Sequence, residues 1–299
     1  MIFYSLIDTS YNPLLNTKHK LDTIKDEQKT ITKGDSLCHM SINKRKFMNT
    51  VSVLILTRNE EQNIKDCIAS CQPFADEVIV IDDGSEDNTV SIAESLGAKV
   101  VHRSMNGDWG AQQTFAIEQA SSHWIFFIDA DERCSSELCK EIKLAIQGED
   151  LAYWIQRHNR FHHNVATHGV LRPDYVCRLM PKEGSYVEGY VHPAIITPYD
   201  KRQLTAPMYH YTYDNWDQYF NKLNKYTTLS AEKYRKANKS VSFLKDIVFR
   251  PFWAFIKMYL LQGGILDGKM GWVLSVNHYF YTMTKYVKLY YLYKSNGKL

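Results

Sequence analysis

Short apolar runs alternate with segments of helical periodicity between residue 51 and residue 132. The runs with strand character are residues 51–56, 77–81, 99–102 and 124–128, and the helical segments are residues 60–71, 88–96 and 110–120. Strands without polar alternation are buried on both faces, and strands that alternate with helices form βαβ units. The sequence therefore predicts an α/β fold with a mainly parallel sheet that helices flank.

The alternation of apolar runs and helical segments ends near residue 151. Residues 151–213 predict short irregular segments rich in aromatic residues and His, residues 215–236 predict a helix, and residues 244–292 predict helix broken near Gly263-Gly264 and Gly268. Residues 1–49 are polar and aperiodic, which is typical of a disordered extension without a catalytic role. Translation from Met40 or Met48 is an alternative interpretation of that segment. Three regions are thus expected: 1–49, 50–213 and 214–299.

Composition excludes several classes of protein. Hydrophobic residues make up 44% of the 299-residue chain, enough for a large core, and a net charge of +3 gives no support for nucleic-acid binding. The 6 cysteines form no CxxC pair and are typical of a reducing cytoplasm. Residues 1–20 lack the pattern of a secretory signal, and the longest apolar stretch, residues 251–266, is interrupted by Lys257, so no transmembrane helix is expected.

Polar clusters follow three of the expected strands. They are Thr57-Arg58-Asn59-Glu60, Asp82-Asp83-Gly84-Ser85 and Asp129-Ala130-Asp131-Glu132. Ligands of open parallel sheets bind outside the carboxyl ends of the strands. The three clusters therefore predict one binding edge.

The pair Asp129 and Asp131 predicts a divalent cation site, because two carboxylates alone would repel a diphosphate whereas Mg²⁺ bridges carboxylates and phosphates. The alternative is a solvated pair that caps a helix beginning at Ser135. Asp82 and Asp83 predict recognition of a base or ribose; they also suit a turn in which Gly84 has positive φ, and the two interpretations are compatible. The chain has no GxGxxG, no P-loop and no GxSxG, which disfavours dehydrogenases, P-loop kinases and α/β-hydrolases.

Three segments carry a family resemblance. Val51-Ser-Val-Leu-Ile-Leu-Thr-Arg-Asn-Glu-Glu61, Val78-Ile-Val-Ile-Asp-Asp-Gly-Ser-Glu-Asp-Asn-Thr89 and Trp124-Ile-Phe-Phe-Ile-Asp-Ala-Asp-Glu132 resemble family 2 glycosyltransferases of the GT-A fold. Gly107-Asp-Trp-Gly-Ala-Gln112, residues 172–179, Val191-His192 and Ile265-Leu-Asp-Gly-Lys-Met-Gly-Trp272 resemble a narrower group, the lipopolysaccharide-core β-1,4-glucosyltransferases. Those enzymes transfer glucose from UDP-glucose to an inner-core heptose, and the resemblance covers about residues 51–292.

The resemblance implies roles for individual residues. Residues 50–132 become the nucleotide-sugar half and residues 133–213 the acceptor half of a catalytic domain. The nucleotide-sugar residues are Thr57, Glu60, Asp82, Asp83, Arg103, Gln112 and Asp129, and the ligands of Mg²⁺ or Mn²⁺ are Asp129, Asp131 and His192. His192 is equally suited to a structural role. Two positions depart from the family pattern: Gln113 stands where a basic residue usually follows Gln112, so Arg103 becomes the alternative phosphate contact, and Pro193 stands where Glu is frequent.

Family 2 transferases invert the anomeric centre and need one general base. The candidates are Asp174, Glu183 and Glu188. We expect Glu188 to be the base because it precedes Gly189 and His192 in the acceptor loop, with Asp174 second.

The last region combines aromatic and basic residues, among them Phe252, Trp253, Tyr259, Arg250 and Lys257. That mixture is typical of a bilayer interface, so we expect peripheral contact with the cytoplasmic face of the inner membrane, where a lipid-linked saccharide acceptor would lie. The alternative is a helix packed on the catalytic domain.

Other functions stay open. The same fold suits an acceptor that is polyprenyl-linked or a capsule intermediate. A sugar nucleotidyltransferase would carry a Gly-rich loop after the first strand, which Thr57-Arg58-Asn59-Glu60 is not. A catalytically dead binding module would not need the intact pair Asp129 and Asp131.

Overall fold

The computed structural model describes residues 49–161, 164–166, 168–171, 174–189, 193–213, 215–295 and 297. The expected extension, apart from Asn49, and His192 lie outside these residues. The first half of the fold confirms the sequence analysis element by element. Its members are β1 (Val51–Thr57), α3 (Ile64–Cys71), β2 (Glu77–Asp82), α4 (Thr89–Ser95), β3 (Lys99–His102), α5 (Trp109–Gln119) and β4 (Trp124–Asp129). These four strands are parallel neighbours in the order β3-β2-β1-β4.

The second half continues the same sheet, so the expectation of irregular structure between residues 151 and 213 was wrong. Its elements are β5 (Glu132–Cys134), α6 (Ser136–Ala145), β6 (Ala152–Phe161), β7 (Asn164–Ala166), η1 (Gly169–Leu171), β8 (Asp174–Pro181), β9 (Tyr186–Glu188), β10 (Ala194–Ile196), β11 (Lys201–Gln203) and β12 (Met208–Tyr213). The sheet continues as β4-β8-β6-β12-β5, with β8 antiparallel to both β4 and β6, whereas β9 and β10 pair with each other in a separate two-stranded sheet. The sheet as a whole is therefore mixed, and only its first half is parallel throughout.

Buried and partly exposed side chains alternate along β6, as expected of a strand, but the hydrophobic pattern of the sequence does not show it. Tyr153, Ile155, Arg157 and Asn159 are its buried positions, and the intervening side chains are partly exposed. Because the last two buried positions are polar, the strand lacks an apolar stripe along its full length. The polar pair marks the part of the strand that reaches the site described below.

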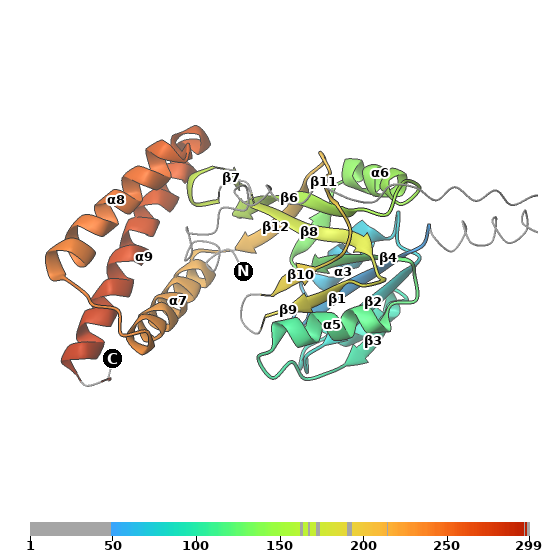
Figure 1. Cartoon of the computed structure of the whole chain (residues 1–299), viewed down its shortest axis with the longest axis horizontal. Coiled ribbons are helices and arrows are strands. Elements are labelled where there is room, and N and C mark those ends of the chain that lie inside the picture. Colours follow the sequence, from blue (N-terminus) through green and yellow to red (C-terminus); the bar gives the residue numbers. More distant parts are fainter. Residues whose placement is uncertain are drawn as a thin grey trace, which may run out of the picture.

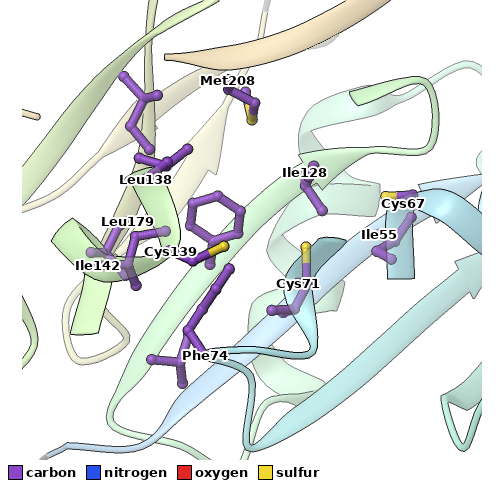
Figure 2. Packing of buried hydrophobic residues seen from close by; sticks show 14 of the residues in the cluster. Ile55, Cys67, Cys71, Phe74, Ile128, Leu138, Cys139, Ile142, Leu179 and Met208 are labelled. Atoms are coloured by element: carbon purple, nitrogen blue, oxygen red, sulfur yellow. The ribbon is translucent and has the colours of Figure 1, made fainter. Parts of the chain in front are cut away.

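Alternate side chains of each central strand enter two separate cores. Val53, Ile55, Phe126 and Ile128 face α3 and α6, whereas Leu54, Ile79 and Phe127 face α5. Figure 2 shows the first core, where Cys67, Cys71 and Cys139 lie among aliphatic side chains and Phe74. Within the described residues the five cysteines, Cys67, Cys71, Cys134, Cys139 and Cys177, are free thiols.

Helices make up the C-terminal region, as expected. They are α7 (Trp216–Lys236), η2 (Phe243–Phe249), α8 (Arg250–Ile256), η3 (Lys257–Leu261), η4 (Gly264–Asp267) and α9 (Gly268–Lys294). They form one group at the end of the molecule away from β1–β4 (Figure 1). The predicted breaks occur at Gly263 and Gly268, both with positive φ. None of the helices in the described ranges is long and apolar enough to cross a membrane.

One close contact joins this helical group to the sheet. The Asp267 carboxylate accepts a hydrogen bond from the His168 backbone amide at 2.8 Å and lies 2.9 Å from the ring Nδ1. Beside it, a Cβ on Gly169 would stand 2.9 Å from the Gly264 Cα, so the two backbones touch only because both residues lack side chains.

Candidate active site

The carboxyl ends of three parallel strands bring the predicted polar clusters to one edge. Thr57 is in register with Asp82, and Leu56 is in register with Asp129. Further bonds join the loops: the Asn59 amide donates to Ser85 Oγ at 2.9 Å and the Glu60 amide donates to Thr89 Oγ1 at 2.7 Å. These bonds therefore hold the loops after β1 and β2 together.

Asp82 and Asp83 differ in what their carboxylates contact. Asp82 is buried and accepts hydrogen bonds from the Gly84 and Ser85 amides, both at 3.1 Å, and His102 Nδ1 lies 3.1 Å from the same carboxylate. Burial raises the pKa of Asp82, but the bonds from Ser85, His102 and Gly84 outweigh it and the pKa is below its usual value. Asp82 thus fixes the turn.

The neighbouring Asp83 carboxylate is 14% exposed. One of its oxygens accepts from the Met105 amide at 2.7 Å, and Arg58 lies 3.5 Å from the other. Of the acidic pair, Asp83 is the member whose carboxylate is accessible at the surface.

Thr57 and Glu60 lie where the nucleotide pocket was expected. The Thr57 hydroxyl is buried and has no hydrogen-bond partner among the described residues. The Glu60 carboxylate is partly buried and accepts from Asn63 Nδ2 at 2.9 Å.

Arg103 and Gln112 form one unit. Arg103 Nη1 donates to Gln112 Oε1 at 3.0 Å and to the Ala111 carbonyl at 2.7 Å, and Gln112 Nε2 donates back to the Arg103 carbonyl at 2.8 Å. The guanidinium lies 4.6 Å from the Phe115 ring centroid. Since Gln112 is buried, it positions Arg103, which is the better placed of the two to meet a phosphate.

Two arginines and one imidazole contact the acidic motif within the protein. Asp129 Oδ2 lies 2.8 Å from Arg178 Nη2 and 3.9 Å from Arg157 Nη1, and Asp131 Oδ2 lies 3.2 Å from His210 Nε2. Burial raises the pKa of each carboxyl, but Arg178 and Arg157 at Asp129, and His210 at Asp131, bring the pKa below its usual value. Both carboxylates therefore stay ionised at neutral pH.

A fully buried carboxylate anchors this arrangement. Glu132 accepts from Arg178 Nη2 at 2.7 Å, from Arg157 Nη1 at 3.2 Å and from the Asp129 amide at 2.9 Å. Arg157 and Arg178 were not predicted as site residues, because they occupy strands β6 and β8 in the segment expected to be irregular. An Arg inside a strand with buried alternate positions is the signal that identifies them.

His210 was also missed, and it takes the place predicted for an imidazole at the acidic motif. It is buried on β12, with Nδ1 2.9 Å from Asn159 Oδ1. The candidate named from the sequence, His192, lies outside the described residues.

The side chains at the motif fit a divalent cation. Asp129 and Asp131 are 31% and 27% exposed, and in the described part of the chain no hydrogen bond reaches Oδ1 of either. The described part of the chain contains no cluster of three His, Cys, Asp or Glu side chains arranged for a metal. Two carboxylates such as Asp129 and Asp131 suit Mg²⁺, which is commonly held by one or two carboxylates with the rest of its shell from substrate phosphates and water. The alternative role of helix cap is wrong, because Ser135 itself caps α6 by accepting from the Leu138 amide.

The two candidate bases lie in different surroundings. Asp174 forms an ion pair with Arg157 and so belongs to the network around Glu132. Glu188 is exposed at the end of β9 and lines a cavity of about 400 Å³ with Arg103, Asp108 and Gly110 at the start of α5. Thr114 Oγ1 bonds both the amide and the carbonyl of Val187 at 3.0 Å, which holds β9 against α5.

This cavity depends on a close backbone approach. A Cβ on Gly110 would stand 2.6 Å from the Gly189 carbonyl oxygen. We expect Gly110→Ala to lower the free energy of unfolding by about 1–3 kcal/mol, because the backbones must separate. Gly148→Ala is the control, since its Cβ would meet only an ordinary contact at 3.4 Å. Urea unfolding of both variants measures the effect; equal stability of the two would show that β9 moves away from α5 without cost.

Known proteins similar to this chain identify its family. Residues 52–262 match the profile described as glycosyl transferase family 2. An uncharacterized glycosyltransferase of Rickettsia bellii (strain RML369-C) is 34% identical over 254 residues, which cover 80% of this chain and 85% of the relative. The lipopolysaccharide core biosynthesis glycosyltransferase LpsC of Rhizobium meliloti (strain 1021) is 29% identical over 250 residues, which cover 80% of this chain and 92% of that protein.

Among solved structures, the chain is similar to glucosyl-3-phosphoglycerate synthase from Mycobacterium tuberculosis in complex with Mn²⁺, UDP and glucosyl-3-phosphoglycerate. The identity is 26%, the coverage is 44% of this chain and 51% of that chain, and the TM-score is 0.32. So low a TM-score assigns neither a donor nor a metal. The family profile spans the strands, the acidic motif and the first part of the helical group, and the arrangement is the expected GT-A fold. The chain belongs to glycosyl transferase family 2.

Proposed function

We propose that this glycosyltransferase is a metal-dependent, inverting hexosyltransferase that transfers glucose from UDP-glucose to an inner-core heptose in lipopolysaccharide or lipooligosaccharide core biosynthesis. The observation that carries the proposal is the sheet edge at which Asp129 and Asp131, at the end of β4, and Asp83, after β2, present partly exposed carboxylates. The relative LpsC, named for core biosynthesis, supports the class of acceptor.

The residues divide the work between donor and acceptor. Asp83 accepts hydrogen bonds from the uracil or ribose, and Arg103 meets the diphosphate. Asp129 and Asp131 would hold Mg²⁺ or Mn²⁺, which as a Lewis acid stabilises the negative charge of the departing UDP. Arg178 and Glu132 keep the Asp129 carboxylate in place.

The transfer itself is a single displacement. An acceptor hydroxyl oxygen forms a bond to C1 of the sugar while the bond from C1 to the diphosphate oxygen breaks, and UDP leaves with that electron pair. The hydroxyl proton passes to a carboxylate. We assign that role to Glu188, because it is exposed in the cavity that also contains Arg103, whereas Asp174 is paired with Arg157.

The acceptor is lipid-linked, so we also propose that the protein works peripherally on the cytoplasmic face of the inner membrane. Support comes from the helical group, where Phe252, Trp253 and Leu260 are each more than half exposed. Aromatic residues beside cations favour the headgroup layer of a bilayer.

A panel of UDP-sugars, incubated with the full chain and Mg²⁺ or Mn²⁺, tests the donor. We expect UDP-glucose to give the fastest release of UDP, and delipidated core oligosaccharide with an exposed heptose to accelerate it. Faster release of UDP with a polyprenyl-linked saccharide than with the core oligosaccharide would support the alternative acceptor class. Absence of release with every UDP-sugar would contradict the proposal.

A further inference from the structure

Large apolar side chains line the outer part of the helical group. Ten of them, here called the apolar ridge, are between 41% and 72% exposed: Phe243, Leu244, Val248, Phe249, Phe252, Trp253, Leu260, Leu261, Ile265 and Leu266. They extend from η2 through η4, and α8 lies on the outside of the group (Figure 1). So many large, exposed apolar side chains within one segment favour an interaction site.

The charges along the ridge are positive wherever they are exposed. Between Phe243 and Leu266 the cationic side chains are Lys245, Arg250 and Lys257, and the single carboxylate, Asp246, is buried. Asp246 accepts from Arg250 Nε at 2.8 Å and from the Ser242 amide at 2.9 Å. The ridge therefore presents apolar groups and cations together, which complements an anionic bilayer.

Three cationic side chains, one of them from the segment of the apolar ridge, lie around the Tyr286 ring. The Tyr286 ring centroid lies 5.2 Å from Arg250 Cζ, 5.6 Å from Lys239 Nζ and 5.3 Å from Lys285 Nζ. The Tyr234 ring stands 5.9 Å from Tyr286. The two lysines also contact Tyr234, at 3.9 Å for Lys239 and 5.5 Å for Lys285.

This cluster has more positive charge than its neighbours balance. Lys285 is 8% exposed, and within the described residues it makes no hydrogen bond or ion pair. Burial, then Lys239 and Arg250, lower the pKa of Lys285 to about 8. Cation–π contacts offset part of this cost, and Asp246 balances only Arg250.

We propose that Lys239, Arg250 and Lys285, with the Tyr234 and Tyr286 hydroxyls, bind the phosphate of an anionic membrane lipid whose acyl chains contact the apolar ridge. Arg250 belongs to both parts, since it is 42% exposed and stands between Phe249 and Phe252 in the chain. An Arg with two lysines suits a phosphate, which accepts several charge-assisted hydrogen bonds. This inference rests on the membrane contact proposed above and is independent of which sugar is transferred.

Vesicle sedimentation with the full chain tests the site. We expect binding to vesicles of phosphatidylcholine with phosphatidylglycerol, and weak binding to phosphatidylcholine alone. Each lysine contributes about fivefold to the affinity for an anionic surface, so Lys239→Met/Lys285→Met should lose about 25-fold. Trp253→Ser should weaken binding to both kinds of vesicle.

Matched controls come from α6, which belongs to the sheet domain. Lys140→Met removes an exposed cation and Leu144→Ser removes a side chain that is 71% exposed, and neither should change vesicle binding. Melting temperatures by circular dichroism identify variants that fail to fold; if the double variant fails, Lys239→Met alone should lose about fivefold.

Three outcomes would overturn the inference. The wild-type protein fails to bind anionic vesicles, the lysine variants bind them as tightly as Lys140→Met, or excess inorganic phosphate releases the protein, which would identify a free anion as the ligand. Release of UDP by the same variants should equal that of the wild type, because the cluster lies outside the transfer site. Loss of lipid binding is therefore distinguishable from loss of the proposed transferase activity.

Discussion

Asp131→Ala is expected to reduce turnover at least ~100-fold, comparable to the loss of a principal electrostatic stabiliser of the transition state. The carboxylate is partly exposed and its Oδ2 lies 3.2 Å from His210 Nε2, so the variant loses a proposed metal ligand without opening the core. Turnover with Mg²⁺ and with Mn²⁺ measures the effect, and UDP affinity by calorimetry should fall in parallel.

Two variants serve as comparisons for this result. Glu94→Ala removes an exposed carboxylate on α4 and should leave turnover unchanged. Asp131→Asn keeps the shape of the side chain but not its charge, so it should resemble Asp131→Ala if the cation is what matters. Near-normal turnover of Asp131→Ala with either metal would contradict the metal assignment.

Glu188→Gln should lower turnover about 100- to 10,000-fold, the usual contribution of a general base. The substitution keeps the size and hydrogen-bonding reach of the side chain but cannot accept the proton. Donor affinity should hold, because the proposed nucleotide contacts are Asp83, Arg103 and the acidic motif instead. Turnover, together with UDP affinity by calorimetry, separates the two effects.

Asp174→Asn is the matched comparison. Its ion pair with Arg157 is lost, so we expect a change in stability and a smaller loss of turnover. If Glu188→Gln retains more than about a tenth of the activity while Asp174→Asn is inactive, the base is Asp174. If both remain active, the proton acceptor lies elsewhere, and Pro193, which departs from the family pattern, is the first place to examine.

The parallel half of the fold was predictable because its central strands β1, β2 and β4 are largely apolar on both faces. Trp124, Phe126 and Ile128 enter one set of contacts and Ile125 and Phe127 another, so no polar position interrupts the run. The helix breaks at Gly263 and Gly268 were equally accessible, since a glycine within helical periodicity marks a change of direction.

The second half was not predictable from periodicity, because its buried positions carry charge. Arg157 on β6 and Arg178 on β8 are buried in a network that includes Glu132, and that pairing joins residues far apart in the sequence. His210 was not predicted as a site residue for the same reason, because only the pairing of β12 with β6 and β5 brings it to Asp131. The acidic motif can be identified from the local sequence. The side chains that contact it are brought there by the order of the strands in the sheet.

The most direct test of the proposed function follows the fate of C1 of the donor. The full chain is incubated with UDP-glucose labelled with ¹³C at C1, Mg²⁺ and delipidated core oligosaccharide, and the anomeric signals are recorded by NMR. The proposal predicts a new β-anomeric signal on the oligosaccharide with one equivalent of UDP. An α-linked product, glucose 1-phosphate in place of UDP, or an unchanged donor would contradict it.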